Sequence, residues 1–270
     1  MVENGSRKTI QSITIQSITN FLKKSSGIRY DYRVNFLFSY FTVILFLPLD
    51  YFSKVIYNIC MVIAIDGPAG AGKSTIARLL AERLHLTYIN SGNIYRVLTL
   101  GCLKKGIDIE NPDAVIMFAE QANITYCERE IFLDQENVNA LLHSDEIDKT
   151  SPLLSAIVPI RRIVNTLIRK ISKDIDVVVE GRDMTSVVFP NAEYRFYLDA
   201  SVETRAKRRF EQSVSGLSLE EITAAIQKRD EIDRNKIEGS LKIVDGVIVL
   251  DTADLTIEQT YDKLLAYIRL

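Results

Sequence analysis

The sequence of 270 residues has few of the residues that build disulfide and metal sites, with three cysteines and two histidines, and it has no tryptophan. Cys60, Cys102 and Cys127 are odd in number and lack metal-ligand spacing, so reduced thiols of a cytoplasmic protein are expected instead of a disulfide framework. His85 falls at the end of a predicted helix and His143 in an irregular stretch. Neither is therefore expected to act as a catalytic base.

An excess of positive charge is also lacking outside the first sixty residues. The formal net charge is -2, and residues 1–60 hold seven Lys/Arg against three Asp/Glu, a balance of +4, so residues 61–270 carry -6. A body this acidic lacks the basic face on which general nucleic-acid binding depends. No nucleic-acid partner is therefore expected, and an anionic ligand has to be held by local arginines.

The first sixty residues differ in character from the rest and allow three interpretations. The run of residues 36–49 is almost wholly apolar, but it has 14 residues and contains Pro48, whereas a helix needs about 20 to cross a bilayer. This run could be a membrane anchor, or the whole segment could be a soluble appendage. The third interpretation is that Met61 is the true start of the protein. We favour the third interpretation, and expect residues 1–60 to lie outside the fold and a membrane contact only if residues 36–49 are a genuine anchor.

From Met61 onward, short β-rich runs alternate with longer helical patterns, which is typical of an α/β fold with a parallel sheet. Helices are predicted at Ser74–Leu84, at Val158–Ile171 and after the capping-box spacing of Ser218 and Glu221. The predicted strands are Val62–Ile65, Leu86–Ile89, Asp176–Val179, Tyr194–Leu198 and Val247–Leu250. Residues 113–155 break this rhythm, and Asn123–Cys127 with Glu130–Leu133 predict a hairpin in an inserted subdomain.

One glycine-rich segment between the first predicted strand and helix fits the phosphate-loop pattern G-x-x-x-x-G-K-[ST]. Glycines let the backbone turn its N–H groups towards phosphate oxygens, the lysine supplies a positive charge, and the serine hydroxyl is a ligand for Mg²⁺. We expect Ser74 to be that Mg²⁺ ligand, with water and the phosphates of a nucleoside triphosphate completing the shell. The residues predicted to bind this triphosphate are Gly67, Pro68, Ala69, Gly70, Ala71, Gly72, Lys73, Ser74 and Thr75.

Arginines distinguish this chain from other phosphate-loop proteins. The Asn-Lys-x-Asp motif of a switch GTPase is absent from the sequence. Instead, Arg96 and Arg182 each follow a predicted strand, at the edge where open α/β sheets bind ligands. Two such guanidinium groups, together with Arg229 on a later helix, suggest two phosphate-bearing substrates. Charged side chains elsewhere usually face solvent, and that interpretation is applied to Arg161, Arg169 and Arg205.

Several segments together resemble bacterial cytidylate kinase. The resemblance runs in order from about residue 62 to 265 and covers none of the first sixty residues. The loop is common to many families, whereas the pairing of SGNIYR with GRDM and VVFP is much more specific. The matching segments are Ile65–Thr75, Ser91–Arg96, Gly181–Met184, Val187–Pro190, Leu198–Ser201 and Arg229–Asn235.

The resemblance implies a P-loop kinase fold: a five-stranded parallel sheet flanked by helices, with an inserted nucleoside-monophosphate-binding subdomain and a mobile lid at about residues 200–240. It also implies transfer of the γ-phosphoryl group from Mg²⁺-ATP to CMP or dCMP, and we expect the chain to act as a monomer. Lys73, Arg96, Arg182 and Arg229 would be the catalytic residues. The implied CMP-binding residues are Ser91, Arg96, Arg162, Arg182, Asp183, Arg229 and Asp233.

Three departures from the family pattern bear on the acceptor. Asn90 stands where the family has Asp, Lys236 where it has Arg, and Thr185 where it has Gly. The alternatives are a kinase of a small hydroxylated metabolite, similar to shikimate kinase, in which Asp183 would act as a base, and a regulatory protein that binds a nucleotide without turnover.

Overall fold

The computed structural model describes residues 60–127, 130–212 and 217–269. The apolar run of residues 36–49, and all but the last residue of the predicted extension, lie outside the described residues. Within the described part no single helix is long and apolar enough to cross a membrane. Only a pair of helices bent by 98° meets that length and composition together, Glu146–Leu154 with Val158–Ile171.

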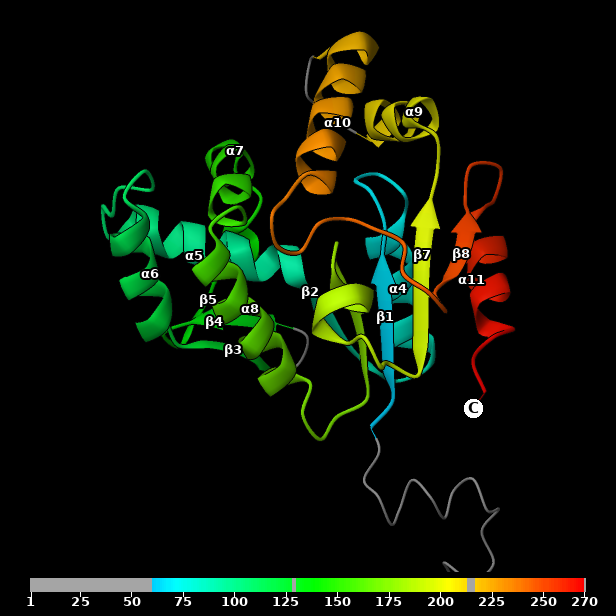
Figure 1. The fold of residues 1–270 in the computed structure, drawn as a ribbon, viewed down its shortest axis with the longest axis horizontal. Coiled ribbons are helices and arrows are strands. Elements are labelled where there is room, and N and C mark those ends of the chain that lie inside the picture. The colour runs from blue at the N-terminus through cyan, green and yellow to red at the C-terminus, as the bar shows by residue number, and fades with distance from the viewer. Residues whose placement is uncertain (1–59, 128–129, 213–216, 270) are drawn as a thin grey trace, which may run out of the picture. The chain divides into compact units, whose positions relative to one another are not determined.

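A five-stranded parallel sheet forms the centre of the fold (Figure 1). The strand order is β2-β6-β1-β7-β8, so the strand before the phosphate loop is the middle one. All five predicted strands are present, within one residue of their predicted bounds at either end. They are β1 (Val62–Asp66), β2 (Thr87–Asn90), β6 (Val177–Glu180), β7 (Tyr194–Asp199) and β8 (Ile248–Asp251).

Helices cover both faces of this sheet, which explains why its central strands are continuous apolar runs. Along β1, Ile63 and Ile65 join one apolar cluster and Ala64 joins the other, as the alternation of side chains in a strand requires. The first cluster includes residues of α4 (Lys73–Arg83) and α11 (Ile257–Leu265). The second includes residues of α5 (Ser91–Lys104), α6 (Pro112–Gln121) and α8 (Val158–Ile171).

A small antiparallel sheet lies beside the helices of the second cluster, and it contains the predicted hairpin. Its strands are β3 (Ile124–Cys127), β4 (Glu130–Leu133) and β5 (Glu136–Asn137), followed by the 3₁₀ turn η1 (Asn139–Leu141) and by α7 (Asp145–Leu154). Ile131 and Leu133 of β4 pack in the same cluster as Leu98 of α5. The small sheet therefore extends the main core and has no separate core of its own.

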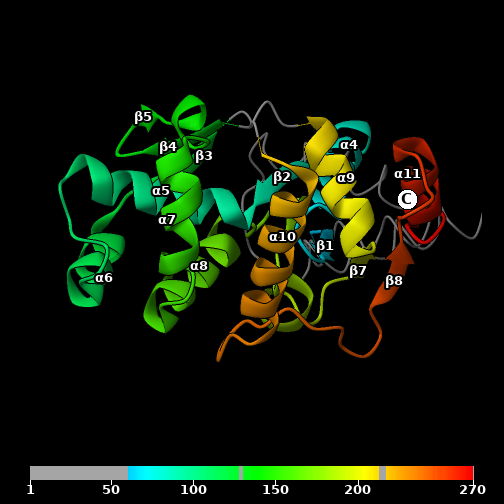
Figure 2. The ribbon, with the colours of Figure 1, turned by 90° about the horizontal axis from the view of Figure 1, so that it is seen from above.

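Two further helices lie at the carboxyl ends of the parallel strands, as Figures 1 and 2 show: α9 (Val202–Gln212) and α10 (Leu219–Arg234). The predicted capping box is present, with Ser218 and Glu221 each bonded to the other's backbone N–H. A short π-helical turn, η2 (Met184–Val188), follows β6 at the same edge of the sheet. This edge, where strands end and helices begin, holds the residues that the sequence predicts to be functional.

Candidate active site

The predicted phosphate loop has a backbone that requires glycine. Gly67 has a φ of 147°, and a Cβ atom there would lie 2.0 Å from the carbonyl oxygen of Leu198 on β7. Gly70 and Gly72 have φ values of 82° and 88°, in the left-handed region that other residues rarely adopt. The chain enters α4 at Lys73 directly afterwards. Strand, glycine-rich turn and helix thus follow one another as an anion-binding loop requires.

The lysine of the loop is buried and lies close to other positive charges. Its Nζ donates a hydrogen bond of 2.7 Å to the carbonyl oxygen of Pro68. Burial first, and then the positive charges of Arg182 and Arg229, lower the pKa of Lys73 to about 7. Cations placed this close repel one another, and a bound polyphosphate relieves that repulsion. The predicted donor-binding lysine and two predicted acceptor-binding arginines therefore belong to one site.

The turn after β6 brings further predicted residues to the loop. Glu180, the last residue of β6, is level with Ile65 of β1 and Asn90 of β2 in the sheet register. Ser91 packs closely against Gly181, the residue that follows Glu180. A Cβ atom added at Gly181 would lie only 2.6 Å from Ser91 Oγ. The structure therefore places Ser91 beside the backbone that leads into Arg182 and Asp183.

Asp183 is paired with Arg161, and not with the predicted Arg162. The Arg161 side chain is 3% exposed, and its Nη2 lies 2.5 Å from Asp183 Oδ2. The Arg162 side chain is 70% exposed and donates to Glu238 Oε2 at 2.9 Å. The interpretation of Arg161 as a solvent-facing residue is therefore wrong, and the structure does not bring Arg162 to Asp183.

The phase of α8 explains the difference between the two arginines. Arg161 precedes the buried residues Val164 and Ile168 by three and seven positions, so all three lie on one face of the helix. Arg162 is turned by about 100° from that face and emerges into solvent. The spacing to Val164 and Ile168 was the signal in the sequence that could have identified Arg161.

An ion-pair network ties Arg182 to the end of α10. Arg182 Nε donates to Asp233 Oδ2 at 2.8 Å, and Lys236 Nζ donates to Asp233 Oδ1 at the same distance. Lys236 also donates to Ser155 Oγ at 3.2 Å. Burial alone would raise the pKa of Asp233, but the charges and hydrogen bonds of Arg182 and Lys236 lower it to about 2. Asp233 is thus held as a carboxylate beside the arginine that follows β6.

Arg96 and Arg229 complete the group of predicted arginines. Arg96 on α5 donates to Asp148 Oδ1 of α7 through Nε and Nη2, at 3.1 and 3.0 Å. Burial first, then Arg182, and to a smaller extent Arg96, lower the pKa of Arg229 to about 10. Arg96 and Arg182 therefore lie near Arg229, and guanidinium groups grouped in this way suit the binding of phosphate groups.

Gly239, in the segment after α10, is a residue that the sequence analysis missed. Its φ is 68°, and its carbonyl oxygen accepts a hydrogen bond from Arg161 Nη2 at 3.3 Å. A Cβ atom at this position would lie 1.9 Å from the same Nη2 and 2.3 Å from Asp183 Oδ2. The close approach of this segment to the Arg161–Asp183 pair therefore depends on glycine.

Arg205 is a second buried arginine that was wrongly interpreted as solvent-facing. Its side chain is 2% exposed, and its Nη1 donates to the carbonyl oxygen of Ala69 in the phosphate loop at 3.0 Å. The guanidinium group also binds both carboxylate oxygens of Asp230, at 3.1 and 2.6 Å, and Nε donates to Ala200 O at 2.9 Å. Arg169, by contrast, is exposed as expected.

The comparison with known families decides which family this fold and site belong to. The family model described as "Cytidylate kinase" matches residues 63–270. The chain belongs to the cytidylate kinase family. That match begins two residues after Met61, at the second residue of β1.

Cytidylate kinases from several bacteria are similar to this chain over nearly their whole length. The protein from Clostridioides difficile is 38% identical over 213 residues, which is 78% of this chain and 99% of that one. The cytidylate kinase of Caldanaerobacter subterraneus is 38% identical over 78% of this chain and 96% of its own. That of Alkaliphilus oremlandii is 40% identical over 75% and 95%.

The donor atoms of this cytidylate kinase family member fit a Mg²⁺ ion that is held mainly by its nucleotide. Among the described residues, no three His, Cys, Asp or Glu side chains are grouped closely enough to hold a metal. Magnesium commonly keeps several waters and binds substrate phosphates with only one or two protein groups. Ser74, the second residue of α4, is exposed and carries a hydroxyl that could serve as such a group.

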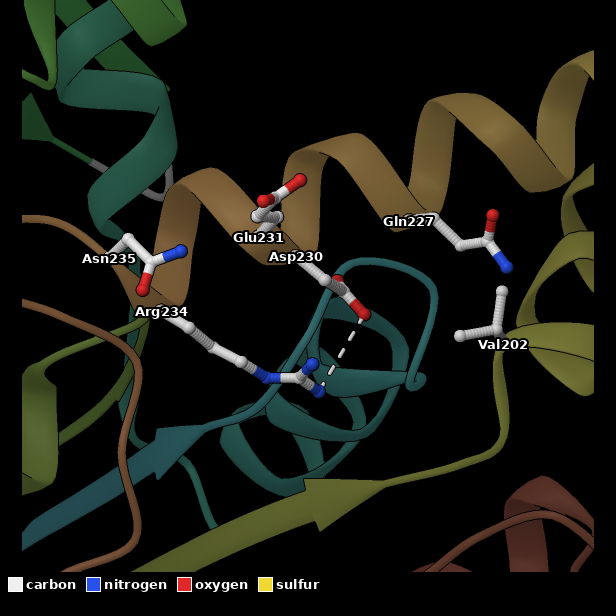
Figure 3. A pocket seen from close by; sticks show the side chains of 6 residues that line it. All are labelled: Val202, Gln227, Asp230, Glu231, Arg234 and Asn235. Atoms are coloured by element: carbon white, nitrogen blue, oxygen red, sulfur yellow. Dashed lines mark ion pairs between the residues drawn. The ribbon is translucent and has the colours of Figure 1, made fainter.

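A cavity of about 330 Å³ lies along the C-terminal half of α10, where Asp230 binds the same Arg205 that donates a hydrogen bond to the phosphate loop. Figure 3 shows Arg234 directed towards Asp230, and their nearest N and O atoms are 3.9 Å apart. Asp230 therefore has the buried Arg205 as its close partner and an exposed arginine at longer range. The cavity is lined by Val202, Gln227, Asp230, Glu231, Arg234 and Asn235.

Proposed function

We propose that this member of the cytidylate kinase family transfers the γ-phosphoryl group of ATP to CMP or dCMP, giving ADP and CDP or dCDP, in pyrimidine nucleotide metabolism. The observation that carries the proposal is that Lys73 of the phosphate loop lies close enough to Arg182 and Arg229 for their positive charges to lower its pKa to about 7. This proximity joins the phosphate loop to the arginine that follows β6 and to an arginine of α10, as a site for two phosphate-bearing substrates requires. We further propose that the enzyme works as a cytoplasmic monomer.

In this proposal, the loop of residues 67–75 binds the ATP phosphates, and Arg96, Arg182 and Arg229 bind the acceptor phosphate and the transferring group. An acceptor phosphate is already anionic, so the reaction depends on positioning and charge stabilisation and needs no general base. Bound Mg²⁺, with Ser74 as its protein ligand, would neutralise charge on the ATP phosphates.

Recognition of the cytosine is assigned to Ser91 and Asp183, with Arg161 taking the place that the sequence analysis gave to Arg162. The Asp183 carboxylate accepts a hydrogen bond from Arg161, which fixes its orientation towards the base. Asp233, held by Arg182 and Lys236, is assigned to the acceptor's sugar and phosphate. Residues 113–155 and about 200–240 are proposed as the acceptor-binding insertion and the lid that closes over ATP.

The alternative, a kinase of a hydroxylated metabolite, is not favoured. It requires Asp183 as a base, but Asp183 is buried and its Oδ2 is paired with Arg161 at 2.5 Å. With Oδ2 engaged by Arg161, this oxygen is not free to accept a proton from a substrate hydroxyl. A regulatory protein that binds one nucleotide without turnover would not need a second set of phosphate-binding arginines such as Arg96 and Arg182.

The proposal is tested by measuring ADP release by the full-length chain with Mg²⁺-ATP and CMP, dCMP, UMP, AMP or shikimate. CMP and dCMP should be used far better than the others. Arg182→Ala should raise the KM for CMP by at least about tenfold and change that for ATP little. The control is Arg83→Ala, which removes an exposed ion pair at the other end of α4. Preference for shikimate, or CMP turnover by Arg182→Ala equal to wild type, would contradict the proposal.

A further inference from the structure

Asp66 is a buried carboxylate with no role in the mechanism above. It is the last residue of β1, immediately before Gly67, and it is fully buried. Its Oδ1 accepts a hydrogen bond of 2.9 Å from the backbone N–H of Met184. Its Oδ2 accepts two more from Thr185, 2.7 Å from the backbone N–H and 2.6 Å from the side-chain hydroxyl.

The three donors belong to the turn that carries the proposed acceptor-binding residues. Met184 and Thr185 open η2 and directly follow Arg182 and Asp183. The first turn of a helix has backbone N–H groups without partners in the helix itself, and a carboxylate that accepts them fixes where the turn begins. Asp66 thereby joins the first residue of the donor loop to the turn on the acceptor side.

We propose that Asp66 and Thr185 are positioning residues for the acceptor: the ionised Asp66 carboxylate holds the turn that presents Arg182 and Asp183, and the Thr185 hydroxyl stabilises this ionised form. The inference rests on the proposed function, because it takes Arg182 and Asp183 as acceptor-binding residues. Neither Asp66 nor Thr185 touches a substrate in this proposal, so both act through the turn.

The environment of Asp66 makes its ionisation sensitive to the hydroxyl. Burial, and to a smaller extent the negative charge of Asp183, raise its pKa, while the hydrogen bonds from Thr185 and Met184 lower it, with a result of about 6. Lys73 of α4 faces it with positive charge, and the Tyr197 hydroxyl of β7 is also nearby. A proton on Asp66 would remove an acceptor and add a donor where three donors already converge.

Acceptor use should therefore decline as the pH falls through about 6, where Asp66 takes up a proton. Loss of the Thr185 hydroxyl weakens the ionised form and raises the pKa of Asp66 further. A hydrogen bond to a charged group is strong enough to move this titration by on the order of one pH unit. The acid side of the pH profile should then shift upward.

The test compares Thr185→Val, which keeps the shape of threonine without its hydroxyl, with Thr185→Ser, which keeps the hydroxyl. For each full-length variant, kcat/KM for CMP is measured from pH 5 to 8 at saturating Mg²⁺-ATP. Thr185→Val should move the acid limb upward by about one pH unit and raise the KM for CMP several-fold at pH 6.5, with the KM for ATP little changed. Thr185→Ser should keep the wild-type limb.

Titration of the acceptor does not affect this comparison, since a phosphate monoester with a pKa near 6 is the same substrate for every variant. If Thr185→Val fails to fold by thermal melting, Thr185→Ala serves as the variant without hydroxyl. An unshifted limb in the hydroxyl-free variant, or an equal shift in Thr185→Ser, refutes the role of the hydroxyl. Normal CMP use by Arg182→Ala would instead refute the proposed function, so the two failures are distinguishable.

Discussion

The buried pair of Arg205 and Asp230 gives the sharpest prediction for stability. The two side chains are 2% and 3% exposed and are joined by two parallel hydrogen bonds. In Arg205→Met, Asp230 would remain buried with only Arg234, 58% exposed and 3.9 Å away, as a compensating charge. Exposed pairs of this kind contribute about 0–1 kcal/mol. The variant would therefore bear most of the penalty for an unpaired buried charge.

Removal of one partner from a buried ion pair costs about 3–5 kcal/mol. The carbonyl oxygens of Ala69 and Ala200 also lose a donor in Arg205→Met, so the upper part of this range applies. For a domain of this size, a loss of about 4–5 kcal/mol corresponds to a fall in melting temperature of about 8–20 °C. The free energy of unfolding is to be measured in urea for the wild type, Arg205→Met, Asp230→Leu and the double variant.

The double variant separates loss of the pair from loss of the arginine alone. Because it leaves no buried charge, it should be destabilised by at least about 3 kcal/mol less than the two single changes added together. Additive effects, or a loss below about 1 kcal/mol in Arg205→Met, would show that the pair is not the buried and unhydrated contact that its geometry indicates.

Three other outcomes are expected. Arg161→Met should raise the KM for CMP at least about tenfold and lower the free energy of unfolding by about 3–5 kcal/mol, whereas Arg162→Met should change both quantities little, because the ion pair of Arg162 is exposed. Equal effects of the two variants in the ADP-release assay would contradict this expectation. Lys73→Ala should lower kcat by at least about 10²-fold with unchanged circular dichroism, and near-normal turnover would remove the lysine from the transferring phosphates. Because the pKa of Asp233 is lowered from 3.8 to about 2, its carboxylate contributes about 2 kcal/mol of stability above pH 4, and this contribution is lost as the pH falls towards 2. The difference in the free energy of urea unfolding between wild type and Asp233→Asn should therefore shrink below pH 4, and a difference that stays constant with pH would exclude the ion pair as its source.

The centre of the sheet could be predicted because β1 and β6 are buried on both faces, so their sequences are almost continuous apolar runs. Strand β6, for example, is buried at every residue. Elements set by local geometry instead of burial were not predicted: β5 has two residues, and η2 depends on the backbone contacts to Asp66.

The phosphate loop could be predicted from the sequence because each of its residues answers a local requirement. The partners of the arginines could not, since they depend on contacts between distant segments. Arg205 is buried because Asp230 lies opposite it from another helix, 25 positions later in the chain. The choice between Arg161 and Arg162 depends on the rotation of α8 against the sheet, for which the spacing of Arg161 to Val164 and Ile168 was the available signal in the sequence.

The register of the central sheet has a consequence for the spacing of the two substrates. Ile65 of β1 pairs with Glu180 of β6, so Gly67 and Arg182 each come two residues beyond a matched pair of backbone positions. Neighbouring strands are about 4.8 Å apart. The offset between the backbone that leaves β1 and the backbone that leaves β6 is thus fixed by a ladder of backbone hydrogen bonds. For the two proposed phosphate sites, this ladder sets how far apart the phosphates are held, and the proposed lid would govern only when they are enclosed.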